Sequence, residues 1–372
     1  MTLALPGQPR AEALLNAGLR APAHAYLLHG PAGTGKRDAA RAFAAALLGC
    51  DERRAVPGSH PDFAQIEPEG EALLVDQVHE LSAALRYRPQ EAPRRVGIVD
   101  EADRLNGDAA NAFLKTLEEP PGEVVLILIA DDLERVLPTV RSRCQPVPFP
   151  PLAAAGIAER LVVDGTPAAA AAAAARRARG DLGFARRLAA DAAVGAWVAG
   201  IEADVAALLT TGLAEDAAVQ RTYAGVKAAG DAAEAEAEAS TAALLERLDR
   251  LPSSREIDRE RKRLETAGKT SASRRRRRAE TDMMRAVIAT VQLVLRDALC
   301  VQAEAADRAG SDLDAAALAA IAEAVPRTAL ERAIADVDDV RRALRQPINV
   351  PLALAAVYAR VGMVRRGEAV PA

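Results

Sequence analysis

The chain has 372 residues, 50% of them hydrophobic but only 3% aromatic, and a formal net charge of −4. This length predicts two or three domains, and the acidic balance argues against a surface that is as a whole a nucleic-acid footprint. The sparse, odd set of cysteines (Cys50, Cys144 and Cys300) favours free thiols in a reducing compartment. Since we find neither an apolar run of membrane-spanning length nor a secretion signal, we expect a cytoplasmic protein without a membrane span.

A glycine-rich segment follows the first predicted strand. The sequence predicts a helix over Gln8–Gly18, a strand over His24–His29 and a helix over Asp38–Leu48. The residues between strand and helix fit the phosphate-binding loop G-x-x-x-x-G-K-[ST] everywhere but at the last position. We therefore take eight residues as candidate nucleotide contacts: Gly30, Pro31, Ala32, Gly33, Thr34, Gly35, Lys36 and Arg37.

The final position of this loop is the unusual one. Backbone N–H groups of the loop cradle phosphate, the lysine reaches the terminal phosphates, and a closing Ser or Thr holds Mg²⁺. Arg37 stands at that position and cannot ligate a cation. The loop therefore predicts a nucleotide site that is poorly built for hydrolysis.

The next elements are a strand over Asp62–Pro68 and a helix over Leu73–Arg86. Cys50 and His60 lie just before them, but a zinc ion needs about four ligands, so we predict no zinc site.

A pair of carboxylates ends the following strand. The apolar run from Arg95 leads into Asp100 and Glu101, at the carboxyl edge of a sheet where α/β proteins bind their ligands. In a P-loop protein the first carboxylate would assist Mg²⁺ and the second would polarise a water molecule. The alternative is a helix N-cap, a position that acidic residues favour.

A helix over Asn106–Glu118, an apolar strand over Val124–Ala130 and a last strand ending at Phe149 complete the first domain. Alternating strands and helices predict an α/β parallel sheet. The prolines from Pro146 to Pro151 mark a boundary, after which only helices are expected. We predict three domains: residues 1–149, a small helical lid over 150–192 and an all-helical bundle over 193–372.

The helical part has two segments that are hard to interpret. Glu215–Leu251 is rich in Ala and Glu, and Ser253–Arg278 is dense in charge, so the order of residues 231–278 stays open. Beyond them, four segments have apolar residues at helical spacing: Met283–Leu299, Leu313–Val325, Ala329–Leu344 and Val350–Val361.

Five consecutive arginines, Arg274–Arg278, lie in the charged segment. We favour a solvated linker or helix start for them. The alternative is a patch that contacts phosphates, because clustered arginines release counterions from DNA.

These motifs together resemble the clamp-loader branch of the AAA+ ATPases, over nearly the whole chain. Two further motifs carry the resemblance most specifically, a helix ending in Leu-Glu-Glu-Pro-Pro (117–121) and Ser-Arg-Cys (142–144). The resemblance implies a RecA-like AAA+ P-loop domain, a lid and a collar domain that holds a hetero-pentamer together. It also implies that Arg143 is an arginine finger, given in trans to ATP on a neighbouring motor subunit. A salt bridge within the domain is the alternative for Arg143.

Three positions depart from the pattern of active relatives. Arg37 replaces the hydroxyl, Gly183 stands where the lid carries a sensing arginine, and neither Ala130 nor Asp131 offers a hydroxyl or an amide. Arg186 and Arg187, one turn after Gly183, could substitute in part. These departures predict that hydrolysis is weak or absent, and they leave open whether the loop is empty, holds ATP or holds ADP.

The resemblance implies the following partners: motor subunits of the gamma/tau type, a delta subunit, the sliding clamp and primer-template DNA. It places the chain in a DNA-directed DNA polymerase assembly, with no polymerase chemistry of its own. Two alternatives remain, an active AAA+ motor subunit of the same complex and a sequence-specific DNA-binding ATPase. The acidic charge and the lack of a helix-turn-helix pattern argue against the latter.

Overall fold

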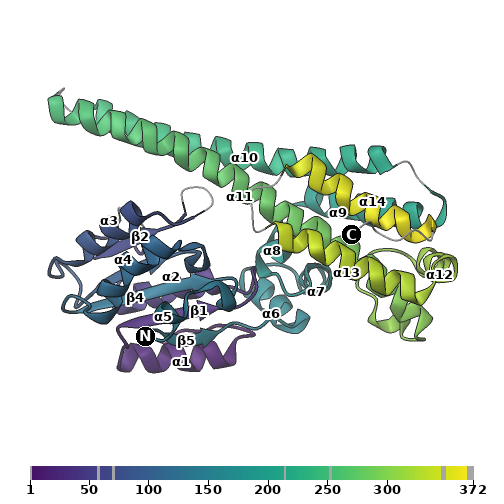
Figure 1. The fold of residues 1–372 in the computed structure, drawn as a ribbon, viewed down its shortest axis with the longest axis horizontal. Coiled ribbons are helices and arrows are strands. Elements are labelled where there is room, and N and C mark those ends of the chain that lie inside the picture. The colour runs from purple at the N-terminus through teal and green to yellow at the C-terminus, as the bar shows by residue number, and fades with distance from the viewer. Residues whose placement is uncertain are drawn as a thin grey trace. The chain divides into compact units, whose positions relative to one another are not determined.

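The computed structural model describes residues 2–56, 59–68, 72–212, 215–250, 254–344 and 349–366 (Figure 1). The chain forms two compact units, Met1–Arg186 and Arg187–Ala372. Each is described by itself below.

The first unit contains a five-stranded sheet in which all neighbouring strands pair in parallel, as the sequence predicts. The strand order is β2-β3-β4-β1-β5. The strands are β1 (Ala25–His29), β2 (Phe63–Ile66), β3 (Arg95–Val99), β4 (Val124–Ala130) and β5 (Gln145–Pro148).

Helices cover both faces of this sheet (Figure 1). Successive residues of a strand point to opposite faces, so Leu28 and Ile127 pack with α1 and α2, whereas Leu27 and Leu128 pack with α3 and α4. All seven residues of β4 are buried, which explains why its sequence is continuously apolar. The helices are α1 (Pro9–Arg20), α2 (Lys36–Leu48), α3 (Val75–Leu85), α4 (Gly107–Glu118) and α5 (Pro138–Arg141), with short 3₁₀ turns η1 (Ala102–Arg104) and η2 (Leu133–Arg135).

The strand order brings the predicted motifs together. β1 lies between β4 and β5, and β3 lies next to β4. Because parallel strands end at the same edge, Gly30 after β1, Asp100 after β3 and Asp131 after β4 share one edge of the sheet.

Helices α6 (Ala154–Val163), α7 (Ala168–Ala178) and α8 (Leu182–Ala190) follow the sheet, where the sequence predicts a small helical lid.

One buried carboxylate fastens a loop of the first unit and gives a stability prediction. Asp62 accepts N–H groups of Gln90, Glu91 and Ala92 at 2.8, 2.8 and 2.9 Å and pairs with Arg95 at 3.4 Å. Burial alone would raise the pKa of Asp62, but these partners lower it below 3.8. We expect Asp62→Ala to lower the free energy of unfolding by about 3 kcal/mol in urea titrations at neutral pH, because charged buried hydrogen bonds are lost. The loss should shrink as the pH falls from the ordinary aspartate range through the lowered pKa of Asp62, because wild-type Asp62 then becomes protonated as well.

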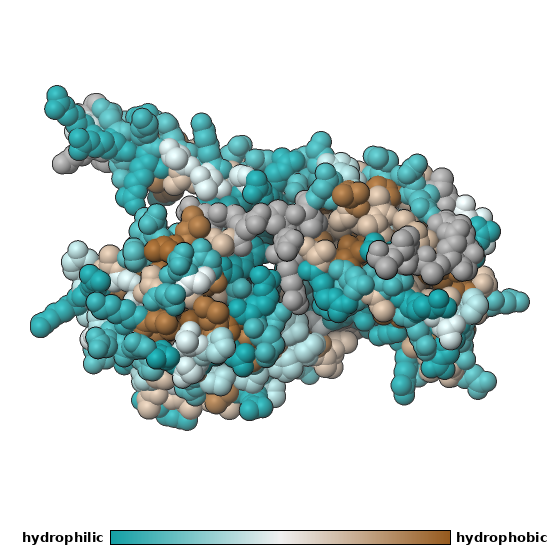
Figure 2. Space-filling model, viewed as in Figure 1, coloured by the Kyte–Doolittle hydropathy of each residue, from teal (hydrophilic) through white to brown (hydrophobic). Residues whose placement is uncertain are grey.

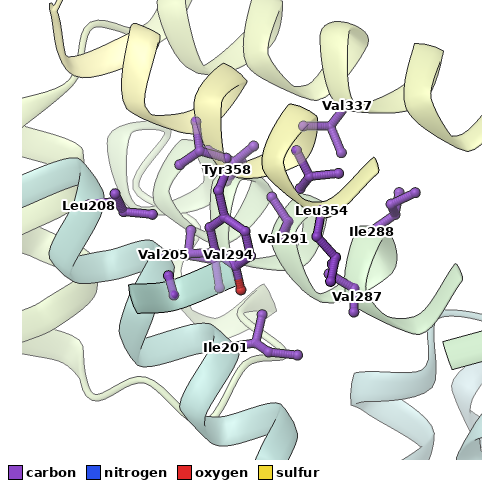
Figure 3. Close-up of a cluster of buried hydrophobic side chains, with 14 of the residues drawn as sticks. Ile201, Val205, Leu208, Val287, Ile288, Val291, Val294, Val337, Leu354 and Tyr358 are labelled. Carbon is purple, nitrogen blue, oxygen red and sulfur yellow. The ribbon is translucent and has the colours of Figure 1, made fainter. Parts of the chain in front are cut away.

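The second unit is all helical in its described residues. Its core gathers buried side chains from all six helices α9 to α14, among them Val205 of α9, Val291 of α11, Val337 of α13 and Tyr358 of α14 (Figure 3). The helices are α9 (Ala192–Thr210), α10 (Glu215–Asp249), α11 (Arg255–Gln302), α12 (Ala315–Ala324), α13 (Arg327–Ala343) and α14 (Val350–Arg366), with a 3₁₀ turn η3 (Ala306–Arg308).

The charged segment of the second unit differs from the interpretation that we favoured. Arg274–Arg278 lie in the middle of α11, a single helix of 48 residues, and not in a linker or at a helix start. α10 and α11 form a long helical hairpin (Figure 1). Arg, Lys and Glu are strong helix formers, so charge density in this segment is compatible with helix.

By length and composition alone, α9 is long and apolar enough to cross a membrane, whereas the sequence analysis expected no such segment. It carries Glu202, which accepts the N–H of Asp312, and Asp204, which pairs with Arg221 at 2.5 Å. These buried carboxylates and its place in the core fit a core helix of the bundle.

Candidate functional site: the phosphate-binding loop and Arg143

The backbone conformation of the loop requires glycine at three positions. Gly30, Gly33 and Gly35 have φ of 145°, 79° and 86°, a region that other residues rarely adopt. A Cβ at Gly30 would also collide with the carbonyl of Phe149. The loop thus has the conformation that the motif predicts, between β1 and α2.

The lysine of the motif is bound within the loop itself. Lys36 is 4% exposed, and its Nζ donates to the carbonyl oxygens of Gly30 and Pro31, both at 2.6 Å. It also pairs with Asp131 at 2.9 Å. Burial lowers the pKa of Lys36, and Asp131 opposes that shift. A phosphate would have to displace these partners before it could use the ammonium group.

Arg37 lies between the two carboxylates that would serve a metal ion. Its Nε is 2.6 Å from Asp100 Oδ2, and its Nη2 is 2.9 Å from Glu101 Oε1. Burial alone would lower the pKa of Arg37, but the two carboxylates outweigh it and keep the pKa raised. The guanidinium therefore supplies the positive charge that Mg²⁺ would supply in an active site.

More carboxylates gather around this pair. The N–H of Asp131 donates to Asp103 at 3.2 Å, and Arg104 pairs with Glu101 at 2.9 Å. Burial raises the pKa of Asp103 and of Glu101, and in Asp103 the neighbouring Asp131 adds to the shift. This edge of the sheet therefore carries further carboxylates in addition to the pair that contacts Arg37.

The lid adds a further carboxylate at the loop. The side chain of Asp181 fills the space that a Cβ of Gly33 would need. Two contacts fix this arrangement, since Leu182 N–H donates to Gly33 O at 2.8 Å and Asp181 Oδ1 accepts the N–H of Phe184 at 2.8 Å.

Of the two residues expected to replace the sensing arginine in part, Arg186 is engaged by other partners. Arg186 pairs with Asp38 at 2.5 Å and with Asp164 at 2.9 Å. It does come close to the first turn of α2, as a sensing residue must. Its charge is balanced there by the two carboxylates.

These residues do not fit Mg²⁺ with a triphosphate. Five carboxylates face three cations at this edge of the sheet, so an approaching polyanion meets net negative charge. They are Asp100, Glu101, Asp103, Asp131 and Asp181, against Lys36, Arg37 and Arg104. Among the described residues no group of three or more His, Cys, Asp or Glu side chains could hold a metal ion.

Arg143 lies apart from this cluster, after α5. Its guanidinium pairs with Glu118, the last residue of α4, and donates to Thr139 O at 3.0 Å and Ser142 Oγ at 3.3 Å. The side chain is 34% exposed. In the single chain Arg143 thus forms a salt bridge within its domain, which was the alternative interpretation. Its side chain remains partly exposed to solvent.

Sequence reasoning missed the partners of the motif residues. Asp131 was considered only for the hydroxyl or amide it lacks, and Asp181 was assigned no role. Gln8, a buried residue that donates to Thr34 O at 3.3 Å and Pro150 O at 2.9 Å, was missed altogether. Each contact joins residues far apart in sequence, so no local pattern could reveal it.

Comparisons with known proteins match the first part of the chain. Residues 8–153 match the family model described as "DNA polymerase III, delta subunit". DNA polymerase III subunit delta' of Pseudomonas aeruginosa is 44% identical over 148 residues, which cover 36% of this chain and 45% of that protein. Subunit delta' of Bacillus subtilis is 35% identical over 169 residues, 42% of this chain and 51% of that protein.

A subunit with a different name matches as well. DNA polymerase III subunit tau of Bacillus subtilis is 34% identical over 150 residues, 37% of this chain and 26% of that protein. The chain thus spans about half the length of the delta' relatives that it matches, and less of tau. These matches confirm the resemblance for the first part of the chain, to subunits of DNA polymerase III of both the delta' and the tau type.

Proposed function

We propose that this chain is a clamp-loader subunit of the delta' type, a largely non-motor AAA+ stator. It would join gamma/tau-type motor subunits and a delta subunit in a hetero-pentamer that loads the sliding clamp on primer-template DNA in the cytoplasm. The observation that carries the proposal is the guanidinium of Arg37 between Asp100 and Glu101. The delta' relatives support the choice of complex.

A stator needs a rigid domain rather than a cycle of nucleotide states. In an active P-loop protein, binding and loss of the γ-phosphate and Mg²⁺ move the parts around the site. Here the carboxylates at the site are paired with cations of the chain itself, Asp131 with Lys36 and both Asp100 and Glu101 with Arg37. The backbone hydrogen bond between Gly33 and Leu182 joins the loop to the lid. The domain would therefore keep one conformation whether or not nucleotide is present.

In this proposal the chain contributes one catalytic group, and it contributes it to a neighbour. Arg143 would leave Glu118 and approach the γ-phosphate of ATP bound to the adjacent motor subunit. A guanidinium there stabilises the charge that spreads over the phosphoryl oxygens as the bond to the leaving group breaks. A contact of moderate exposure, such as the pair with Glu118, is weak enough to exchange for a phosphate.

The alternative is an active motor subunit, and tau is among the relatives. We expect the purified chain to show no ATP turnover above background, whereas active enzymes of this kind reach about 1 s⁻¹ or more. Phosphate release by wild type and by Lys36→Ala should be indistinguishable. Turnover near 1 s⁻¹ that Lys36→Ala abolishes would establish the motor and exclude the stator.

A further inference from the structure

The α10–α11 hairpin has a segregated charge pattern that the proposed function leaves unexplained. Over residues 231–249 of α10 there are six acidic side chains and one basic one. Over residues 255–279 of α11 there are eleven basic side chains and four acidic ones. One helix of the hairpin is therefore acidic and its partner is basic.

Part of this charge is used between the two helices. Arg276 pairs with Asp231 at 3.0 Å and Glu234 at 2.7 Å on α10, and with Glu280 at 3.1 Å on its own helix. Gly268 faces α10 closely, because a Cβ there would collide with Thr241. These contacts fix which side of α11 is turned to α10.

The opposite side of α11 carries a row of exposed basic side chains. Counting around the helix from Gly268 places Arg259, Lys262 and Arg277 on the far half, with Lys269 at its border. All four side chains are exposed, and within the described part of the chain none of the four has an ion-pair partner. Three of the four acidic residues of the same stretch, Asp258, Glu260 and Glu265, fall on the half that faces α10. We call Arg259, Lys262, Lys269 and Arg277 the basic stripe.

The composition of the basic stripe selects among polyanions. Between its cations lie Thr266, Thr270 and Ser273, which offer hydroxyls and no apolar anchor for a lipid surface. Residues 255–282 contain no aromatic side chain, so they cannot stack on bases as single-strand binders do. Figure 2 shows hydrophilic residues over the outer end of the hairpin.

We propose that the basic stripe binds the phosphate backbone of duplex DNA without reading its sequence. The stripe runs about 27 Å along a straight helix at 1.5 Å per residue, comparable to one turn of the duplex. Its cations replace counterions condensed on the phosphates, and α10 holds the helix straight. This inference does not rest on the proposed function, since it follows from the hairpin alone.

The test uses the full chain and a fluorescent duplex of random sequence, with anisotropy followed over a salt series. Four contacts predict a slope of log K against log salt of about −4. Changing the four residues of the basic stripe to Gln should remove most of that slope and weaken binding by more than about tenfold at low salt. Arg259→Lys together with Arg277→Lys should bind as wild type, because phosphate contacts depend on charge.

The matched control neutralises four exposed arginines of α13 that already have acceptors: Arg327, Arg332, Arg341 and Arg342. It changes the net charge equally, and it should leave both slope and affinity near wild type. Circular dichroism verifies that the helix content of each variant is retained. Equal loss in both quadruple variants, salt-independent binding, or binding to anionic vesicles or single strands in preference to the duplex would each overturn the proposal.

Discussion

Replacement of Arg143 by alanine is expected, on the proposed function, to slow ATP hydrolysis by about a thousandfold or more at the one motor site that would face this chain. The reason is that an arginine finger acts in the transition state and not in nucleotide binding, so ATP affinity at that site should change little. The measurement is single-turnover hydrolysis in a reconstituted loader whose other motor sites have been inactivated.

Two variants from the same surface separate this effect from damage to the interface. Arg141→Ala removes a neighbouring half-exposed guanidinium whose partner is Glu134, and it should keep normal turnover. Glu118→Gln removes the charge that holds Arg143 within the chain, so turnover should be unchanged or faster. If Arg143→Ala hydrolyses ATP as wild type does, or if Arg141→Ala is equally slow, Arg143 is not the finger.

The sheet and the phosphate-binding loop could be predicted because their signals are local. β4 has an apolar run of strand length, and the glycines between β1 and α2 occupy backbone conformations that only glycine tolerates easily. Asn106 accepts the N–H of Ala109 at the start of α4, a cap that sequence alone indicates.

The sequence could not predict which side chains of the site pair with one another, because these pairs join residues that are distant in the sequence. Arg37 was expected only to lack a metal ligand, whereas in the structure it pairs with Asp100 and Glu101, more than sixty positions away. The hairpin was missed for a different reason. Apolar periodicity finds helices that bury one face in a core, and most of the hairpin packs only one helix against another through small and charged residues such as Gly268 and Arg276.

The second large effect is expected at the lid. Asp181→Asn should raise the affinity of the isolated chain for ATP or ADP by about ten- to hundredfold. It removes a negative charge from the immediate neighbourhood of Gly33, where a phosphate would bind. A unit charge some 5 Å from a phosphate is worth up to about 3 kcal/mol at the effective dielectric of a protein surface. Titration with a fluorescent nucleotide in the absence of Mg²⁺ measures the change.

Asparagine is the right substitute because Asp181 also caps α8 through the N–H of Phe184, and asparagine caps helices as well as aspartate does. The control is Asp191→Asn, since Asp191 caps α9 through Ala193 in the same way and the change in net charge is identical. Unchanged nucleotide affinity in Asp181→Asn, or an equal gain in Asp191→Asn, would show that the lid carboxylate does not exclude phosphate. Adding Arg37→Thr to Asp181→Asn should then make binding depend on Mg²⁺, because Asp100 and Glu101 lose their internal cation and a hydroxyl ligand is restored.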